Sequence, residues 1–298
     1  MEWRDAYTYQ VAGRKVSFDR PVQRLSKGEK TEKGLRQIST LKFPAGSPYQ
    51  LVEAEGWLLD SQIHVKTHYR PEGVRMEICG SGEYAVDTRG NLIEVLQRPA
   101  DELQFEQSLL GPPLILALAL QGVWCLHASA VSYQGNCLVF LGDSGRGKST
   151  LAAYLAGQSG FSLVSDDILP IEVGHDQVRA YADFPQLKLP EDERVQQQGG
   201  AIPVQGFFLL EDLPQLALKE VEQTTAVSTL VHNTAAARTF SRELLTQHLD
   251  ACVQAAGLVP VFRLGYPRDY DRLPDVADKL KVSLNFLERS QLEYQEEG

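Results

Sequence analysis

The feature that most constrains the fold of this chain is a glycine-rich loop between an apolar run and a helical run. Residues 142–150 read Gly-Asp-Ser-Gly-Arg-Gly-Lys-Ser-Thr and satisfy the pattern Gly-x4-Gly-Lys-Ser/Thr in full. The apolar run 136–141 before the loop is typical of a strand, and Leu151, Ala152 and Leu155 recur after it at helical spacing. This order of strand, loop and helix predicts an α/β fold built around a phosphate-binding loop.

Each residue type in the loop has a chemical reason to be there. Glycines let backbone N–H groups turn inward around phosphate oxygens, at the positive end of the following helix. Lys148 is placed to reach the β and γ phosphates of a nucleotide, and the Ser149 hydroxyl to ligate Mg²⁺. We therefore expect ATP with Mg²⁺ at this loop. The expected nucleotide-binding residues are Gly142, Asp143, Ser144, Gly145, Arg146, Gly147, Lys148, Ser149 and Thr150.

Two adjacent carboxylates follow the next apolar run. Leu163-Val164-Ser165 leads into Asp166 and Asp167, which we expect at the exit of a short strand. In a doubly wound sheet, such exits face the ligand crevice. Phosphoryl transfer uses one carboxylate near the metal and one that takes the proton of the acceptor hydroxyl. The alternative interpretation is a solvated turn before Pro170.

His127 lies in a mostly apolar, strand-like run at 124–131, just before the strand that enters the loop. A single histidine on such a run is usually a satisfied core residue. If its strand is the neighbour of the loop strand, the imidazole can instead hydrogen-bond an aspartate and tune it. The spacing favours neither interpretation.

The character of the chain changes at about residue 100. Before it, short runs rich in β-branched and aromatic residues alternate with turns, and residues 87–91 are predicted to form a hairpin loop. After it, helix-like and strand-like segments alternate, which favours helices packed on a sheet. The apolar stretch 114–120 is far shorter than the roughly 20 residues that span a bilayer, and we expect it to form a buried helix. We expect a β-rich domain for substrate recognition or an accessory role at 1–100, and a catalytic domain at 101–298.

Charge and cysteine content exclude several classes of function. The formal net charge is −10, whereas general binding of nucleic acid needs a basic face. Four widely spaced cysteines contain no CxxC pair and suggest neither a zinc site nor a redox motif. The chain opens with polar residues and lacks the basic and apolar pattern of a leader. We therefore expect a cytoplasmic protein without nucleic-acid or membrane partners.

His127, the loop 142–150 and the pair Asp166-Asp167 resemble, in order and spacing, the catalytic domain of the HPr kinase/phosphorylase family. The resemblance covers about residues 105–282. It implies a P-loop kinase domain of the HPr kinase and phosphoenolpyruvate carboxykinase type. It further implies that Asp166 is the general base, that Asp167 and Ser149 hold magnesium, and that His127 orients Asp166. Lys148 would stabilise the transferring group.

The resemblance also includes Lys188, which lies at a recurring basic position of these relatives. It implies that Lys188 contacts phosphate or substrate. The alternative interpretation of Lys188, an exposed lysine on a loop, is equally consistent with the sequence. The chain departs from the family at Thr150, where a glutamate is usual, and in lacking the long arginine-rich signature. Dephosphorylation and recognition of HPr are therefore not implied. The resemblance leaves a homo-oligomer possible.

These observations lead to one main hypothesis for the function. The chain is similar to tailoring kinases of peptide natural products, including lasso peptides, so we expect ATP-dependent transfer to a serine or threonine hydroxyl of a peptide or protein. One alternative is a kinase of a small metabolite such as free serine. Another is a nucleotide-dependent switch without an acceptor. A reaction of the phosphoenolpyruvate carboxykinase kind is less favoured, because those chains are much longer and no matching set of manganese ligands is found.

Overall fold

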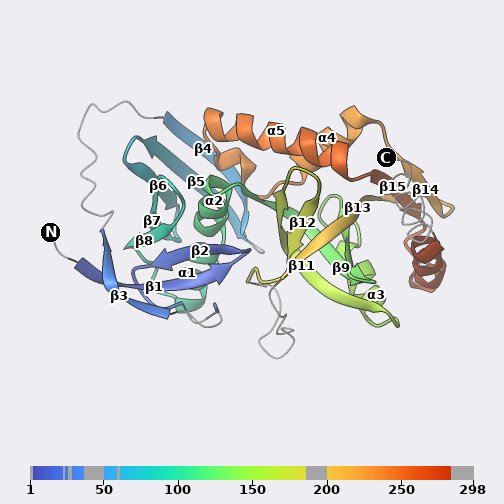
Figure 1. Cartoon of the computed structure of the whole chain (residues 1–298), viewed down its shortest axis with the longest axis horizontal. Helices are drawn as coiled ribbons and strands as arrows, with labels where there is room; N and C mark the ends of the chain where they lie inside the picture. Colours follow the sequence, from blue (N-terminus) through green and yellow to red (C-terminus); the bar gives the residue numbers. More distant parts are fainter. Residues whose placement is uncertain are drawn as a thin grey trace.

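Two β-sheets carry the part of the chain that the structure describes (Figure 1). The computed structural model describes residues 3–22, 24–25, 29–36, 50–58, 61–185 and 200–282. One sheet has eight strands in the order β3-β1-β2-β8-β7-β6-β5-β4, and the other has seven in the order β10-β9-β11-β12-β13-β15-β14. With the helices packed on them, the architecture is mixed α/β.

The first sheet is built mainly from antiparallel neighbours, and β2 and β8 pair in parallel. The hairpin predicted at residues 87–91 joins β7 to β8 and is confirmed. Asp87 closes it by accepting hydrogen bonds from the backbone N–H groups of Asn91 (2.6 Å) and Leu92 (2.9 Å). The strands are β1 Trp3–Val11, β2 Arg14–Phe18, β3 Glu29–Arg36, β4 Gln50–Leu58, β5 Ser61–Arg70, β6 Gly73–Ile78, β7 Gly82–Asp87 and β8 Leu92–Gln97.

Helices α1 (Glu102–Leu110) and α2 (Pro112–Leu120) connect the two sheets. All of α2 except Leu120 is buried, and the helix packs against β7 and β8 on one side and β9 on the other. Gly90 approaches α2 so closely that a Cβ atom there would lie 2.0 Å from the Ala117 carbonyl oxygen. The segment Glu102–Leu120 is long and apolar enough to cross a membrane by length and composition alone, but 78% of its most apolar 18-residue window is buried inside the protein. The buried helix expected at 114–120 is confirmed.

The second sheet positions the glycine-rich loop. Strand β10 enters the loop, pairing antiparallel with β9 and parallel with β13, which in turn pairs parallel with β15. The carboxyl ends of β10, β13 and β15 therefore meet at one edge. The strands are β9 Val123–Tyr133, β10 Asn136–Leu141, β11 Phe161–Val173, β12 Val178–Tyr181, β13 Ala201–Asp212, β14 Ala217–Glu220 and β15 Val261–Tyr266.

Helices cover both faces of this sheet. Helix α3 packs with Leu138 and Phe140 of β10, whereas Val139 and Leu141 face the core that contains residues of α4 and α5. This alternation is that of a strand buried on both sides. Helix α5 runs along both sheets (Figure 1), reaching from β4 to the turn after β11. The helical elements are α3 Lys148–Ala156, α4 Gln223–His232, the 3₁₀ turn Ala237–Thr239, α5 Arg242–Leu258, the 3₁₀ turn Tyr270–Arg272 and the helical residues 273–282.

Strand β11 corrects one expectation. Asp166 and Asp167 do not stand at the exit of a short strand, because β11 continues to Val173. The long partner β9 supplies ladder pairing as far as Glu172 opposite Val123, and this pairing outweighs the local turn signals at Asp-Asp and Pro170. The register shifts between Leu163 and Ser165, just before the two aspartates. Such irregularities re-aim side chains beside functional sites.

Polar contacts join the two sheets near β2 and β11. Arg14 forms an ion pair with Glu172, whose other carboxylate oxygen accepts from the Tyr181 hydroxyl at 2.6 Å. The backbone N–H of Ala12 donates to Asp183 at 3.0 Å. Burial alone would raise the pKa of Glu172, but the hydrogen bonds from Tyr181 and Arg14 outweigh it, so this pKa is lowered. The ionised carboxylate therefore stabilises the junction.

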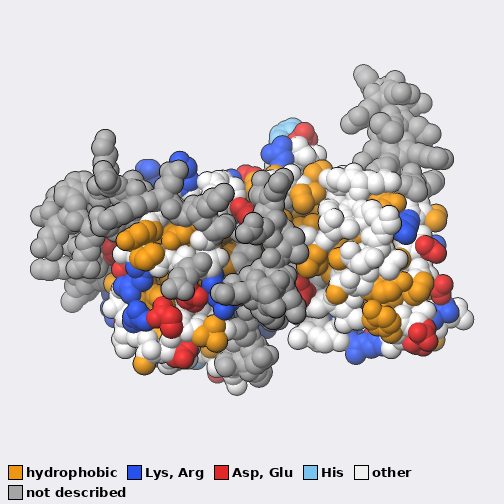
Figure 2. Space-filling view, turned by 90° about the horizontal axis from the view of Figure 1, so that it is seen from below, with side chains coloured by type: hydrophobic (Ala, Val, Ile, Leu, Met, Phe, Trp, Pro, Cys, Tyr) orange, Lys and Arg blue, Asp and Glu red, His pale blue; other side chains and the backbone are white. Residues whose placement is uncertain are grey.

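Charged side chains are mixed on the face seen from below. On the part of this face that the structure describes, Lys and Arg lie beside Asp and Glu in both halves of the molecule (Figure 2). The described surface in this view therefore presents no single broad basic patch of the kind that binds a phosphate backbone.

We expect Glu172→Gln to lower the free energy of unfolding by roughly 1 kcal/mol at neutral pH, because a partly exposed ion pair contributes on that order. The native pKa is depressed, so the stabilisation is present above the ordinary value of 4.5 and is lost as the pH falls through the lower native pKa. Urea unfolding of wild type and variant at several pH values measures the difference. Glu220→Gln, at an exposed position, is the control. If the difference in free energy of unfolding between wild type and Glu172→Gln were equally large at pH 3, the ionised Glu172 carboxylate would not be its source.

Candidate functional site

The loop 142–150 adopts a backbone that only glycine forms readily at three positions. Gly142, Gly145 and Gly147 have φ values of +136°, +78° and +90°. Gly147 is the N-cap of α3, which begins at Lys148. A Cβ atom at Gly145 would meet nothing within 4 Å, so glycine is required there by its backbone angle and not by packing. The loop is therefore an open turn at a helix N-terminus, which is the geometry that binds anions.

Lys148 lies inside this turn. Its side-chain Nζ donates to the carbonyl oxygens of Gly142 at 2.7 Å and Asp143 at 3.2 Å, and the residue is 6% exposed. A buried ammonium group needs such partners, because burial of an unpaired charge is costly. The amine is thereby held at the Gly142 end of the loop, where an incoming phosphate would find it.

Asn233, the C-cap of α4, connects three parts of the site. Its side-chain Oδ1 accepts from the backbone N–H of Gly142 at 3.1 Å, and its Nδ2 donates to Thr229 of α4 at 2.8 Å. Its backbone oxygen accepts from His127 N at 2.7 Å. Where β10 turns away from β9 into the loop, residues 233–235 lie beside β9 instead, and Thr234 forms a β-bridge with Leu126. Asn233 therefore fixes the start of the loop relative to β9 and α4.

Ser129 links the loop strand to the aspartates. It stands opposite Phe140 of β10 on one side and Asp166 of β11 on the other. Cross-strand neighbours point to the same face, here the face that carries α3. The fully buried Ser129 hydroxyl donates to Asp166 Oδ1 at 2.7 Å. Asp166 lies two strands from Phe140, about 10 Å away at ordinary strand spacing.

His127 and Asp167 form the next pair along the same strands. His127 Nδ1 lies 3.6 Å from Asp167 Oδ1, and the carboxylate side chain is 14% exposed. His127 lies on β9, which pairs with β10, the strand that enters the loop. The condition under which its imidazole can hydrogen-bond an aspartate is therefore met. The structure gives a contact between His127 and Asp167, while the Ser129 hydroxyl donates to Asp166; the expected orientation of Asp166 by His127 stays a prediction. Asp167 has a φ of +105°, a strained angle of the kind that clusters at functional sites.

An acidic pair at the end of β13 also adjoins the loop. Asp212 accepts from Arg146 at 2.9 Å and from Arg268 at 2.6 Å, and Arg268 also donates to the Gly145 carbonyl. Glu211 pairs with Arg263 at 2.9 Å. Two guanidinium groups share one carboxylate beside the loop, so the local balance is positive and favours an anion. Arg268 therefore contacts the loop itself.

The residues present fit a nucleotide with magnesium. Open backbone at a helix N-terminus, a buried lysine and the positive balance at Arg146 and Arg268 suit phosphate oxygens. Ser149 is exposed at the first turn of α3, and Asp167 supplies a carboxylate. Among the described residues no group of three or more His, Cys, Asp and Glu side chains can hold a metal. Mg²⁺ is usually held by one or two carboxylates together with substrate phosphates, and Asp167 would supply one such carboxylate.

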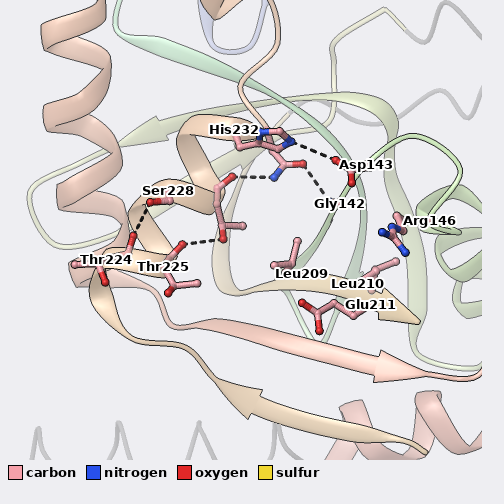
Figure 3. Close-up of a pocket in the computed structure, with 12 residues that line it drawn as sticks. Gly142, Asp143, Arg146, Leu209, Leu210, Glu211, Thr224, Thr225, Ser228 and His232 are labelled. Carbon is pink, nitrogen blue, oxygen red and sulfur yellow. Dashed lines mark hydrogen bonds and ion pairs between the residues drawn. The ribbon is translucent and has the colours of Figure 1, made fainter. Parts of the chain in front are cut away.

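A cavity of ≈ 570 Å³ opens beside the start of the loop (Figure 3). One wall is the loop, the second is the end of β13 with Glu211, and the third is the polar face of α4. His232 of α4 lies 3.2 Å from Asp143 of the loop and bounds one side. The cavity is therefore continuous with the expected phosphate site.

The structure brings most of the expected site residues to one region, through the pairing of β9, β10 and β11. Lys188 lies outside the described residues, and its expected contact stays a prediction. Glu211, Asp212, Ser129 and Asn233 were not expected. A signal for the first two was present, since the apolar run 207–210 ends in Glu-Asp as the earlier run ends in Asp-Asp. No local signal distinguishes Ser129 or Asn233.

No protein-family model matches this chain, and no curated protein matches it. Among solved structures it is similar to the HPr(Ser) kinase/phosphatase from Coxiella burnetii, at 11% sequence identity. The match covers 57% of this chain and 96% of that chain, with a TM-score of 0.33.

We expect Asn233→Ala to weaken both the fold and the loop. Removing the carboxamide leaves the buried Gly142 N–H unsatisfied, which costs about 1–3 kcal/mol. The free energy of unfolding should fall by that amount, and the Kd for ATP, measured by calorimetry, should rise about tenfold, since the loop loses its anchor. Asn91→Ala, in the exposed hairpin, is the control. Unchanged ATP affinity in a folded Asn233→Ala protein would show that this bond does not shape the loop.

Proposed function

We propose that this protein is an ATP-dependent kinase that transfers the γ-phosphoryl group to a serine or threonine hydroxyl of a peptide or protein. The observation that carries the proposal is the grouping of the loop, the buried Lys148 and the Asp166-Asp167 segment that follows the register shift of β11. A phosphate-binding loop alone serves many functions. A carboxylate held by a buried hydroxyl on the neighbouring strand adds a group that can accept a proton.

The reaction is an in-line displacement. A bond forms between the acceptor oxygen and the γ phosphorus, the bond to the β–γ bridging oxygen breaks, and ADP leaves. Asp166 receives the proton of the acceptor hydroxyl. Ser129, by donating to Asp166 Oδ1, fixes which oxygen faces the acceptor.

Positive groups stabilise the charge that develops on the transferring group. Lys148 provides an ammonium group at the Gly142 end of the loop. Magnesium, when bound, supplies further charge neutralisation, and Ser149 and Asp167 are the residues that would hold it. His127 orients Asp167 from 3.6 Å. Arg146 and Arg268 can exchange their bonds to Asp212 for bonds to phosphate oxygens.

Two other functions keep part of this site. A kinase for free serine would use the same loop and aspartates on a smaller acceptor. A nucleotide-dependent switch would need the loop but no base, and the strained, hydrogen-bonded aspartate segment argues against it. The proposal includes a peptide or protein acceptor, no nucleic-acid or membrane partner, and assembly into a homo-oligomer.

Incubation of the protein with γ-labelled ATP, Mg²⁺ and a panel of serine- and threonine-containing peptides tests the proposal. We expect label in peptide, a fall of about 100-fold or more in Asp166→Asn, and a comparable loss in Lys148→Ala. Asp176→Asn, at an exposed turn, is the matched control for the aspartate. Transfer at the wild-type rate by Asp166→Asn would exclude it as the base, and phosphate release without any acceptor labelling would favour the switch.

Ser129→Ala tests the positioning role of its hydroxyl. The loss of one hydrogen bond to a charged group, about 1.5–3 kcal/mol, should lower kcat by roughly 10- to 100-fold. The KM for ATP should stay unchanged, because Ser129 does not contact the loop amides. Ser129→Thr keeps the hydroxyl and should restore part of the rate. Equal losses in both variants would indicate disturbed packing instead of a lost bond.

A further inference from the structure

We propose that the cavity between the loop and α4 is the acceptor subsite, and that it receives the serine or threonine residue of a peptide. This inference rests on the proposed kinase function and adds to it the place and chemistry of the acceptor. The cavity is lined by Gly142, Asp143 and Arg146 of the loop, by Glu211 at the end of β13, and by the face of α4 that carries Thr225 and Ser228.

The position of Lys148 shows which end of a nucleotide faces this cavity. In loops of this pattern the lysine reaches the β and γ phosphates. Here its Nζ lies against the carbonyl oxygens of Gly142 and Asp143, and these two residues also line the cavity. The transferable phosphoryl group therefore lies next to the cavity. An acceptor has to approach from this side.

The cavity walls offer mainly neutral hydrogen-bonding groups. Thr224, Thr225 and Ser228 lie along one face of α4, across the cavity from Arg146 and Glu211 (Figure 3). The charged groups on the walls already have partners: Glu211 with Arg263, Arg146 with Asp212, and Asp143 with His232. Such walls suit a hydroxyl with flanking amide groups, as in a peptide, better than the two full charges of free serine.

The volume agrees with this class of acceptor. At ≈ 570 Å³ the cavity lies within the roughly 300–1,000 Å³ typical of sites for small ligands. It can take one residue with parts of its neighbours but not a folded domain. A peptide would thus present an extended segment, with the rest of its chain outside the cavity.

Asn233 connects the cavity to the strand next to that of the candidate base. Asn233 lines the cavity, and its backbone oxygen accepts from the N–H of His127 in β9. Strand β9 also carries Ser129, whose hydroxyl donates to Asp166 of β11. The cavity, the loop and β9 therefore meet at this asparagine, and Asp166 lies on the strand that pairs with the other edge of β9.

Filling the cavity from α4 tests the inference. Ser228→Phe places an aromatic ring on the exposed, cavity-lining face of the helix. Val231→Phe is the matched control, since it puts the same side chain on an exposed position of α4 outside the cavity lining. Thr225→Val removes a lining hydroxyl at nearly constant volume and serves if the larger variant does not fold. Circular dichroism checks folding.

Two quantities are measured for each protein: the Kd of a fluorescent ATP analogue, and the KM for γ-label transfer to serine peptides and to free L-serine. We expect Ser228→Phe to raise the peptide KM about tenfold or more, Thr225→Val to raise it a few-fold, and the nucleotide Kd to stay within about twofold in both. Val231→Phe should change neither quantity.

Other outcomes overturn the inference in distinguishable ways. A weaker nucleotide Kd with an unchanged peptide KM would show that the cavity holds the nucleoside. If Ser228→Phe changed neither the nucleotide Kd nor the peptide KM, the acceptor would bind elsewhere, and the kinase function would remain intact. Labelling of free serine alone would assign the cavity to a metabolite. Binding of ATP without transfer to any acceptor by the wild type would overturn the proposed function itself.

Discussion

The placement of β9 between β10 and β11 is the constraint on which the rest of the site depends. Its backbone hydrogen bonds hold the strand that enters the phosphate loop on one side and the strand with the two aspartates on the other. The register is such that Ser129 faces both Phe140 and Asp166. A shift of one residue would turn Ser129 and His127 to the opposite face and separate Ser129 from Asp166. The geometry of the candidate site is thus set by strand register.

The second organising element is α4 with the segment after it. Residues 233–235 take over the edge of β9 that β10 leaves when it turns into the loop. This exchange satisfies the backbone groups of β9 and brings the Asn233 carboxamide to Gly142. It also places the hydroxyl-bearing face of α4 across from the loop. One short segment therefore shapes both the phosphate site and the cavity beside it.

The eight-stranded sheet is attached to this site through a shared core and a few polar contacts. Helix α2 is buried between the sheets, and the Arg14–Glu172–Tyr181 group links β2 to the far end of β11, the strand that carries Asp166. The junction therefore connects the eight-stranded sheet to the strand that carries the two aspartates. How far the two halves act as separate domains, as expected from the change at residue 100, stays a prediction.

The sequence by itself determined the local elements whose signals are strong: the strand, loop and helix around residues 142–150, the buried helix at 114–120 and the hairpin at 87–91. In each case glycine angles or apolar periodicity act over a few neighbouring residues. Only the tertiary structure decided the length of β11, the pairing of His127 with Asp167, and the roles of Ser129, Asn233 and Asp212. These depend on partners far away in the chain, such as Gly142 and Asn233, which are 91 residues apart. No local pattern encodes a hydrogen bond over that separation, because it forms only once the strand register and the helix packing are in place.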